Sequence, residues 1–127
     1  MNGIKVLLID DEVRYTDALA RRLGRRGLSV ATADGGPQAL DAMSETSMDV
    51  VLLDIRMAGM DGINTLSAIK RLHPEVEVVM LTAHADTDIV ISSLAMGAFD
   101  YLVKPVDVEE LVRKIEDAAI RKRSNSK

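Results

Sequence analysis

The feature that most constrains the fold is an uninterrupted apolar run that ends in a carboxylate. Residues 50–53 read Val-Val-Leu-Leu, and Asp54 follows directly. Branched aliphatic residues without polar alternation are typical of a central strand that helices cover on both faces. Glycines at positions 59 and 62 indicate a loop that leads from this strand into a helix. Asp54 is therefore expected at the end of a buried strand, where a carboxylate is unfavourable unless a cation or a reaction compensates its charge.

Other short apolar runs alternate with helical patterns along the rest of the chain. Strands are expected at residues 4–9, 28–33, 49–54, 76–82 and 99–103. Helices are expected at residues 13–26, 36–45, 62–72, 86–96 and 107–120. This alternation predicts right-handed crossovers and a five-stranded parallel sheet with five helices on both faces, a doubly wound α/β sandwich.

Helical periodicity also predicts which side chains face the core. In the first helix the expected core side consists of Val13, Thr16, Ala20 and Leu23. The fourth helix has a thin apolar side, for which we expect Ile89, Val90 and Leu94. It is expected to be the least firmly anchored element.

Composition limits the class of protein. A length of 127 residues suits one domain, expected over residues 1–121, with residues 122–127 as a polar tail or the start of a linker. The chain has no cysteine, which excludes disulfides and thiolate metal sites. No apolar segment approaches the roughly 18 residues of a membrane-spanning helix, so we expect a cytoplasmic protein without membrane contact. The net charge of −4 argues against direct binding of nucleic acid.

Polar side chains follow the ends of four expected strands. Asp10 and Asp11 follow the first, Asp54 ends the third, Thr82 ends the fourth and Lys104 follows the fifth. Strands of a parallel sheet end at one edge, and the order 2-1-3-4-5 makes the first and third strands neighbours, so the aspartates should converge. Carboxylates at such a short distance repel one another and require a positive charge among them.

Mg²⁺ is the expected counter-charge, and Mn²⁺ can substitute, because these ions prefer hard oxygen ligands. The amine of Lys104 and the hydroxyl of Thr82 suit phosphoryl oxygens. With this help, Asp54 can attack phosphorus and form an acyl phosphate. Each feature alone also has a structural interpretation: the acidic pair can cap a helix, Thr82 can simply end a strand, and Lys104-Pro105 can form a turn.

From Lys5 to about Arg121, the sequence resembles the receiver domain of bacterial two-component response regulators. The resemblance rests on Asp10-Asp11, Asp54, Thr82-Ala83 and Lys104-Pro105 together. It implies a flavodoxin-like signalling domain, not a classical enzyme, with Mg²⁺-dependent self-phosphorylation and self-dephosphorylation at one aspartate. Asp54 would receive a phosphoryl group from the phosphohistidine of a sensor histidine kinase or phosphotransfer protein.

The resemblance also implies roles for the surrounding residues. Asp11, Asp54 and the main-chain carbonyl of Arg56 would hold Mg²⁺, with Asp10 bound mainly through water. Thr82 and Lys104 would bind the phosphoryl oxygens. Tyr101 matches the aromatic residue that turns inward as Thr82 moves; ordinary strand packing is the alternative explanation for an aromatic there. The Lys104-Pro105 bond would be cis.

The aspartyl phosphate would then switch the face formed by the fourth helix, the fifth strand and the fifth helix. That face would act on a downstream effector domain or protein, and a homodimer on phosphorylation is compatible with it. The sequence departs from the family at Ala58, where proline is common, so we expect a looser loop there. Arg56 and His84 would flank the site and tune the loss of the phosphoryl group to water.

Two other functions use the same architecture. An aspartate-dependent phosphatase would place its nucleophile and acid two residues apart after the first strand, whereas Asp10 and Asp11 are adjacent. A flavin- or nucleotide-binding module would have glycines in that turn to cradle phosphate, but the turn reads Asp-Asp-Glu.

Overall fold

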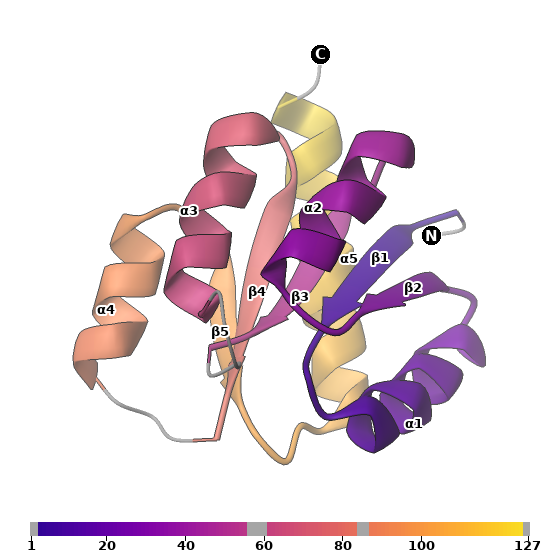
Figure 1. Cartoon of the computed structure of the whole chain (residues 1–127). Coiled ribbons are helices and arrows are strands. Elements are labelled where there is room, and N and C mark those ends of the chain that lie inside the picture. Colours follow the sequence, from indigo (N-terminus) through magenta and orange to yellow (C-terminus); the bar gives the residue numbers. More distant parts are fainter. Residues whose placement is uncertain (1–2, 56–60, 84–86, 126–127) are drawn as a thin grey trace.

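The computed structural model describes residues 3–55, 61–83 and 87–125 and contains alternating strands and helices (Figure 1). The strands are β1 (Lys5–Ile9), β2 (Ser29–Ala33), β3 (Val50–Asp54), β4 (Glu77–Thr82) and β5 (Asp100–Val103). The helices are α1 (Val13–Gly24), α2 (Gly36–Glu45), α3 (Gly62–Leu72), α4 (Thr87–Ala95) and α5 (Val108–Asn125). Each strand begins one residue later than expected and ends where expected.

All five strands are parallel and lie in the order β2-β1-β3-β4-β5, as predicted. In this register Ile9 pairs with Leu53, and Asp54 pairs with Leu81. The carboxyl ends of β1, β3 and β4 are therefore adjacent along one edge of the sheet. This edge is where the predicted site residues are expected.

Helices cover both faces of the sheet. Val50 and Leu52 of β3 belong to the core on the side of α1 and α5. Val51 and Leu53 belong to the core on the side of α2 and α3, against which Ile89 of α4 also packs. Figure 1 shows α3 and α5 on opposite sides of the strands. Every residue of β3 is buried, which confirms the prediction of a central strand.

The predicted core side of α1 is partly wrong. Thr16 and Leu23 are buried as expected, but so is Leu19, whereas Val13 is 58% exposed. The apolar stripe is set by Leu19 and Leu23, which lie one helical turn apart. Val13 lies in the first turn and lines a pocket beside Asp10. The helix ends at Gly24 and not at Arg26.

The shallow packing of α4 agrees with the sequence, but one of its predicted core residues does not. Among the side chains described in this helix, Val90 and Ser93 are buried and Ile89 is partly buried. Leu94 was expected to face the core and is 41% exposed. Ser93 takes an inward position because its hydroxyl donates to the carbonyl of Ile89 at 2.8 Å.

The last helix extends beyond residue 120, to Asn125, and its end binds the amino ends of β3 and β4. Lys122 Nζ lies 3.4 Å from Asp49 Oδ1, and Arg121 Nε lies 3.1 Å from Glu77 Oε2. Arg123 Nη2 lies 3.6 Å from Asp49 Oδ2. Both carboxylate residues are buried. We call Asp49, Glu77, Arg121, Lys122 and Arg123 the basal cluster; it lies at the opposite edge of the sheet from Asp54.

Candidate functional site

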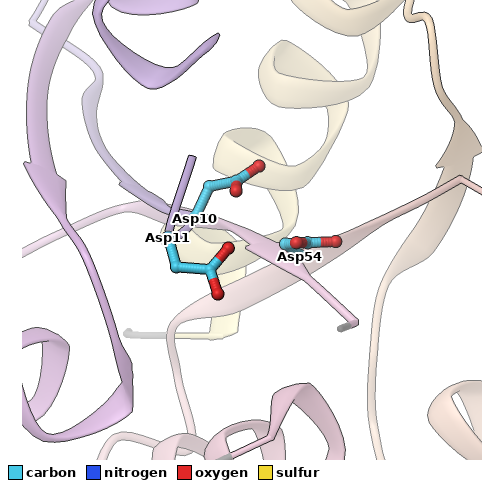
Figure 2. Close-up of side chains that lie close together, drawn as sticks. All are labelled: Asp10, Asp11 and Asp54. Atoms are coloured by element: carbon cyan, nitrogen blue, oxygen red, sulfur yellow. The ribbon is translucent and has the colours of Figure 1, made fainter. Parts of the chain in front are cut away.

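Three aspartates converge at the carboxyl edge of the sheet, as predicted. Asp10 follows β1, Asp11 is the next residue, and Asp54 ends β3. One carboxylate oxygen of each lies within 4.8 Å of the others. Figure 2 shows the three side chains gathered where the two strands end. Asp10 and Asp54 are 1% and 6% exposed, while Asp11 is exposed to solvent.

Both carboxylate oxygens of Asp10 accept hydrogen bonds. The backbone N–H of Glu12 donates to Oδ1 at 2.9 Å, and Lys104 Nζ donates to Oδ2 at 2.7 Å. Glu12 is the N-cap residue of α1, but its side chain makes no capping hydrogen bond. Asp10 instead orders the turn that carries Asp11.

Lys104 joins two of the aspartates. Its Nζ lies 3.5 Å from Asp54 Oδ1 in addition to its bond to Asp10, and its side chain is 14% exposed. Burial alone would lower the pKa of Lys104, but the hydrogen bond to Asp10 and the charge of Asp54 outweigh it and raise the pKa above its ordinary value. The ammonium form is therefore favoured at this edge. The Lys104-Pro105 peptide bond is cis, as the resemblance implied.

Thr82 lies at the same edge, and the predicted switch residue lies on the neighbouring strand. Thr82 is buried at the end of β4, and its carbonyl accepts the backbone N–H of Lys104 at 2.7 Å. Tyr101 pairs with Met80 and is partly buried against the core on the α2 and α3 side. Arg56, Ala58 and His84 lie outside the described residues.

Sequence reasoning missed Tyr15, which lies beside Lys104. The centroid of its ring is 4.6 Å from Lys104 Nζ. Burial raises the pKa of Tyr15, and the nearby Asp10 and Asp54 add to this effect while Lys104 opposes it. A helical stripe drawn through Leu19 and Leu23 would have placed Tyr15, one turn earlier, on the core side of α1.

The donor set fits a hard divalent cation. Three carboxylates supply anionic oxygens, the ligands that Mg²⁺ prefers, and the one group of metal-ligating side chains found among the described residues is this one. Their closeness would be unfavourable without a positive charge among them. The acidic group is thus consistent with a metal site.

Comparison with known proteins gives the family. Residues 6–116 match the model of the response regulator receiver domain. The chain is 42% identical over 113 residues to the DNA-binding transcriptional regulator NtrC of Escherichia coli (strain K12), an alignment that covers 89% of this chain and 24% of that protein. It is 40% identical over 117 residues to the transcriptional regulatory protein ZraR of the same strain, covering 92% of this chain and 26% of the relative. The chain therefore spans about a quarter of the length of these curated relatives.

Solved structures show the same architecture. A response regulator receiver domain protein from Clostridium thermocellum superposes with a TM-score of 0.90 at 36% identity, covering 95% of this chain and 98% of that one. NtrX from Brucella abortus, solved in complex with ADP, gives a TM-score of 0.92 at 32% identity, covering 99% of this chain and 29% of that one.

The acidic pocket and the comparisons agree on the class of protein. Within the described residues, no helix is both long and apolar enough to cross a membrane. The phosphatase and nucleotide-binding alternatives have no support from the family match, which covers most of the chain. The chain belongs to the receiver domains of two-component response regulators, signalling modules that imply a histidine kinase partner, and it is homologous to the receivers of NtrC and ZraR.

Proposed function

We propose that Asp54 accepts a phosphoryl group from the phosphohistidine of a sensor histidine kinase or phosphotransfer protein, in a Mg²⁺-dependent reaction. The observation that carries this proposal is the meeting of Asp10, Asp11 and Asp54 with the ammonium group of Lys104 at one edge of the sheet. Asp54 is the natural acceptor because it ends the central strand, whereas both oxygens of Asp10 already accept hydrogen bonds and Asp11 is exposed to solvent.

The transfer exchanges one bond to phosphorus for another. An oxygen of Asp54 forms the new O–P bond while the P–N bond of the donor breaks, and its electron pair stays with the imidazole nitrogen. Lys104 is placed to neutralise charge on the phosphoryl oxygens, since its Nζ lies 3.5 Å from Asp54 Oδ1. Thr82, at the end of the next strand, would donate its hydroxyl to the same oxygens. The bound cation would shield the carboxylates and neutralise charge on the transferred group.

The hydrogen bonds in the structure suggest which proposed ligands would bind the cation directly and which would bind it through water. Asp10 already accepts hydrogen bonds on both oxygens, which favours contact with the cation through water. Asp11 and Asp54 would bind the cation directly, and the main-chain carbonyl of Arg56 completes the proposed set. Mn²⁺ would substitute because it accepts the same oxygen donors.

The proposed output is a change in the surface formed by α4, β5 and α5. A new dianion on Asp54 would draw Thr82 and Lys104 toward it, and Tyr101 would follow Thr82 inward. The element that repacks at lowest cost is α4, because few of its described side chains are buried while Ile91 and Leu94 are exposed. A downstream effector domain or protein would read this surface, with a homodimer as one form of the output and no direct contact between this domain and nucleic acid.

Intact-mass spectrometry tests the proposal. Incubation with acetyl phosphate and Mg²⁺ should add the mass of one phosphoryl group, and removal of Mg²⁺ by a chelator should prevent it. Asp54→Asn should take up none, whereas Asp41→Asn, a matched change on the exposed side of α2, should behave like the native chain. Uptake by Asp54→Asn equal to that of the native chain would place the acceptor elsewhere.

A further inference from the structure

We infer that Tyr15 is a positioning residue for Lys104: its ring holds the ammonium group at the carboxyl edge of the sheet, within reach of a phosphoryl group on Asp54. The inference rests on the proposed function, because it explains how Lys104 is kept available for that reaction. Tyr15 belongs to α1, whereas Lys104 follows β5, so the contact joins two segments that are distant in sequence.

Among the residues that the structure describes, three groups are recorded close to the ammonium group of Lys104. Asp10 Oδ2 lies at 2.7 Å, Asp54 Oδ1 at 3.5 Å, and the centroid of the Tyr15 ring at 4.6 Å. The last distance is well inside the range over which the face of an aromatic ring attracts a cation. Since the Lys104 side chain is 14% exposed, water screens these attractions only weakly.

The ring contact differs from the two ion pairs in what it depends on. A divalent cation bound by the aspartates would compensate the charge of Asp10 and Asp54 and would repel Lys104. The long flexible side chain of Lys104 could then turn away from the carboxyl edge of the sheet. The attraction of the ring arises from its own quadrupole and does not depend on the charge of the carboxylates. Tyr15 is therefore the neighbour that retains Lys104 when the ion pairs weaken.

The surroundings of Tyr15 keep the ring in place. Tyr15 packs against the core on the α1 and α5 side, and it lines a small cavity of about 190 Å³ together with Pro105, the residue after Lys104. The ring and the backbone that carries Lys104 are thus held side by side. The Tyr15 hydroxyl is buried and has no hydrogen-bond partner in the described part of the chain. The contact to Lys104 is made by the ring, because Nζ lies over it.

Rates of phosphorylation by acetyl phosphate test the inference. Tyr15→Phe keeps the ring and should stay within about two-fold of the native rate, whereas Tyr15→Leu should lower it about five-fold, or ~1 kcal/mol. Phe99→Leu is the matched control, because Phe99 is also partly buried against the same core but lies under Arg121, 5.8 Å from its guanidinium carbon. This control should leave the rate unchanged.

Two further measurements separate positioning from a general effect on the fold. The ε-protons of Lys104, assigned by their absence in Lys104→Arg, should be shifted upfield by the ring in the native chain and in Tyr15→Phe, with or without Mg²⁺. They should return to the ordinary lysine position in Tyr15→Leu. In a Lys104→Ala background, Tyr15→Leu should have no further effect on the rate, because the two changes remove one interaction.

The outcomes distinguish this inference from the proposed function. A native chain that takes up no phosphoryl group overturns both. A native chain that is phosphorylated overturns the inference alone if Tyr15→Leu reacts at the native rate, or if the Lys104 shift does not depend on the ring. If Tyr15→Leu does not fold, a fluorinated phenylalanine at position 15 keeps the ring but weakens its quadrupole. It should lower the rate relative to Tyr15→Phe, and an equal rate overturns the inference.

Discussion

Gly62 shows how closely the backbone is packed around the acceptor. A Cβ atom at this position would lie 2.5 Å from the carbonyl oxygen of Asp54 and 2.6 Å from both the Cα and the carbonyl oxygen of Ile55. All three are backbone atoms, which have little freedom to move aside. The N–H of Gly62 also donates to the carbonyl of Ile55 at 3.0 Å. The start of α3 is thus seated directly on the chain that carries Asp54.

Gly62→Ala should therefore be destabilising and should disturb the acceptor. We expect a loss of about 1–3 kcal/mol in the free energy of unfolding, measured by urea denaturation, because a methyl group is forced into filled space. Phosphorylation by acetyl phosphate should also slow. Gly24→Ala is the control, because a Cβ atom added at this position would meet nothing within 4 Å. Alanine is also a better helix former than glycine, so stability should stay the same or rise. Equal stability of the two variants would contradict the packing described here.

Repulsion among Asp10, Asp11 and Asp54 predicts that Mg²⁺ stabilises the fold. At a concentration one hundred times its Kd, a ligand that binds only the folded chain adds ~2.7 kcal/mol. Thermal unfolding should therefore shift to higher temperature with added Mg²⁺. Asp11→Asn should reduce this shift strongly, while Asp41→Asn should keep it. A shift that is the same in all three proteins would mean that the cation binds elsewhere.

At the scale of elements, the basal cluster fixes the end of α5. Asp49 accepts the backbone N–H of Lys5 at 2.9 Å as well as facing Lys122 and Arg123. Glu77 faces Lys70 of α3 at 3.4 Å in addition to Arg121. Buried carboxylates with several cationic partners are costly to disturb, because removing one partner leaves charges uncompensated. The end of α5 is therefore bound to the sheet by charge as well as by its apolar face.

Asp49→Asn should loosen that end without affecting the chemistry at the other edge. We expect a loss of about 1–3 kcal/mol in stability and faster amide exchange over residues 118–124, because the cations lose their anion. The rate of phosphorylation should be unchanged. Glu109→Gln breaks the exposed pair between Arg26 and Glu109 and should change stability by less than about 0.5 kcal/mol. Unchanged exchange in Asp49→Asn would show that apolar packing alone holds the helix end.

The sequence predicted the elements better than their faces. Apolar runs such as residues 50–53 are unambiguous, because a strand buried on both sides tolerates no polar residue. The core side of α1 was misassigned since Val13 and Leu19 are both apolar, and only the packed structure shows which one the sheet covers. The basal cluster was missed for a different reason. Nothing local distinguishes Asp49 or Lys122 from solvated charges, and their contact depends on where α5 ends.

The candidate site was predictable to the extent that topology decides it. The strand order and the parallel direction of the strands bring Asp10, Asp54 and Lys104 to one edge, so their convergence followed from the pattern of elements. The contact of Tyr15 with Lys104 depends on the rotation of a helix about its axis. Such details come from packing, which the periodicity of a short helix specifies only within about one residue.

For the molecule as a whole, the titration of Lys104 and Tyr15 predicts that the free energy of unfolding falls at alkaline pH. The pKa values of Lys104 and Tyr15 are both raised from ordinary values of 10.5 and 10.0, so the folded chain keeps these protons to higher pH than the unfolded chain. The stabilisation is fully present below the ordinary values and is lost as pH rises through the folded ones. Urea denaturation at several pH values from neutrality into alkali should show this fall. Tyr15→Phe should make this fall with pH shallower. An identical slope in the variant and the native chain would mean that the pKa of Tyr15 is not raised by folding.

The placement of the basal cluster has a mechanical consequence. The helix α5 begins four residues after Lys104, on the carboxyl side of the sheet, and ends at the opposite side of the molecule, where the C-terminus lies in Figure 1. With 18 residues it is roughly 27 Å long. Near its end, the cationic side chains of the basal cluster pair with Asp49 and Glu77 and hold the helix to the sheet. Sliding of α5 along its axis would break these ion pairs, so we expect a displacement at the carboxyl edge of the sheet to tilt the helix about its far end.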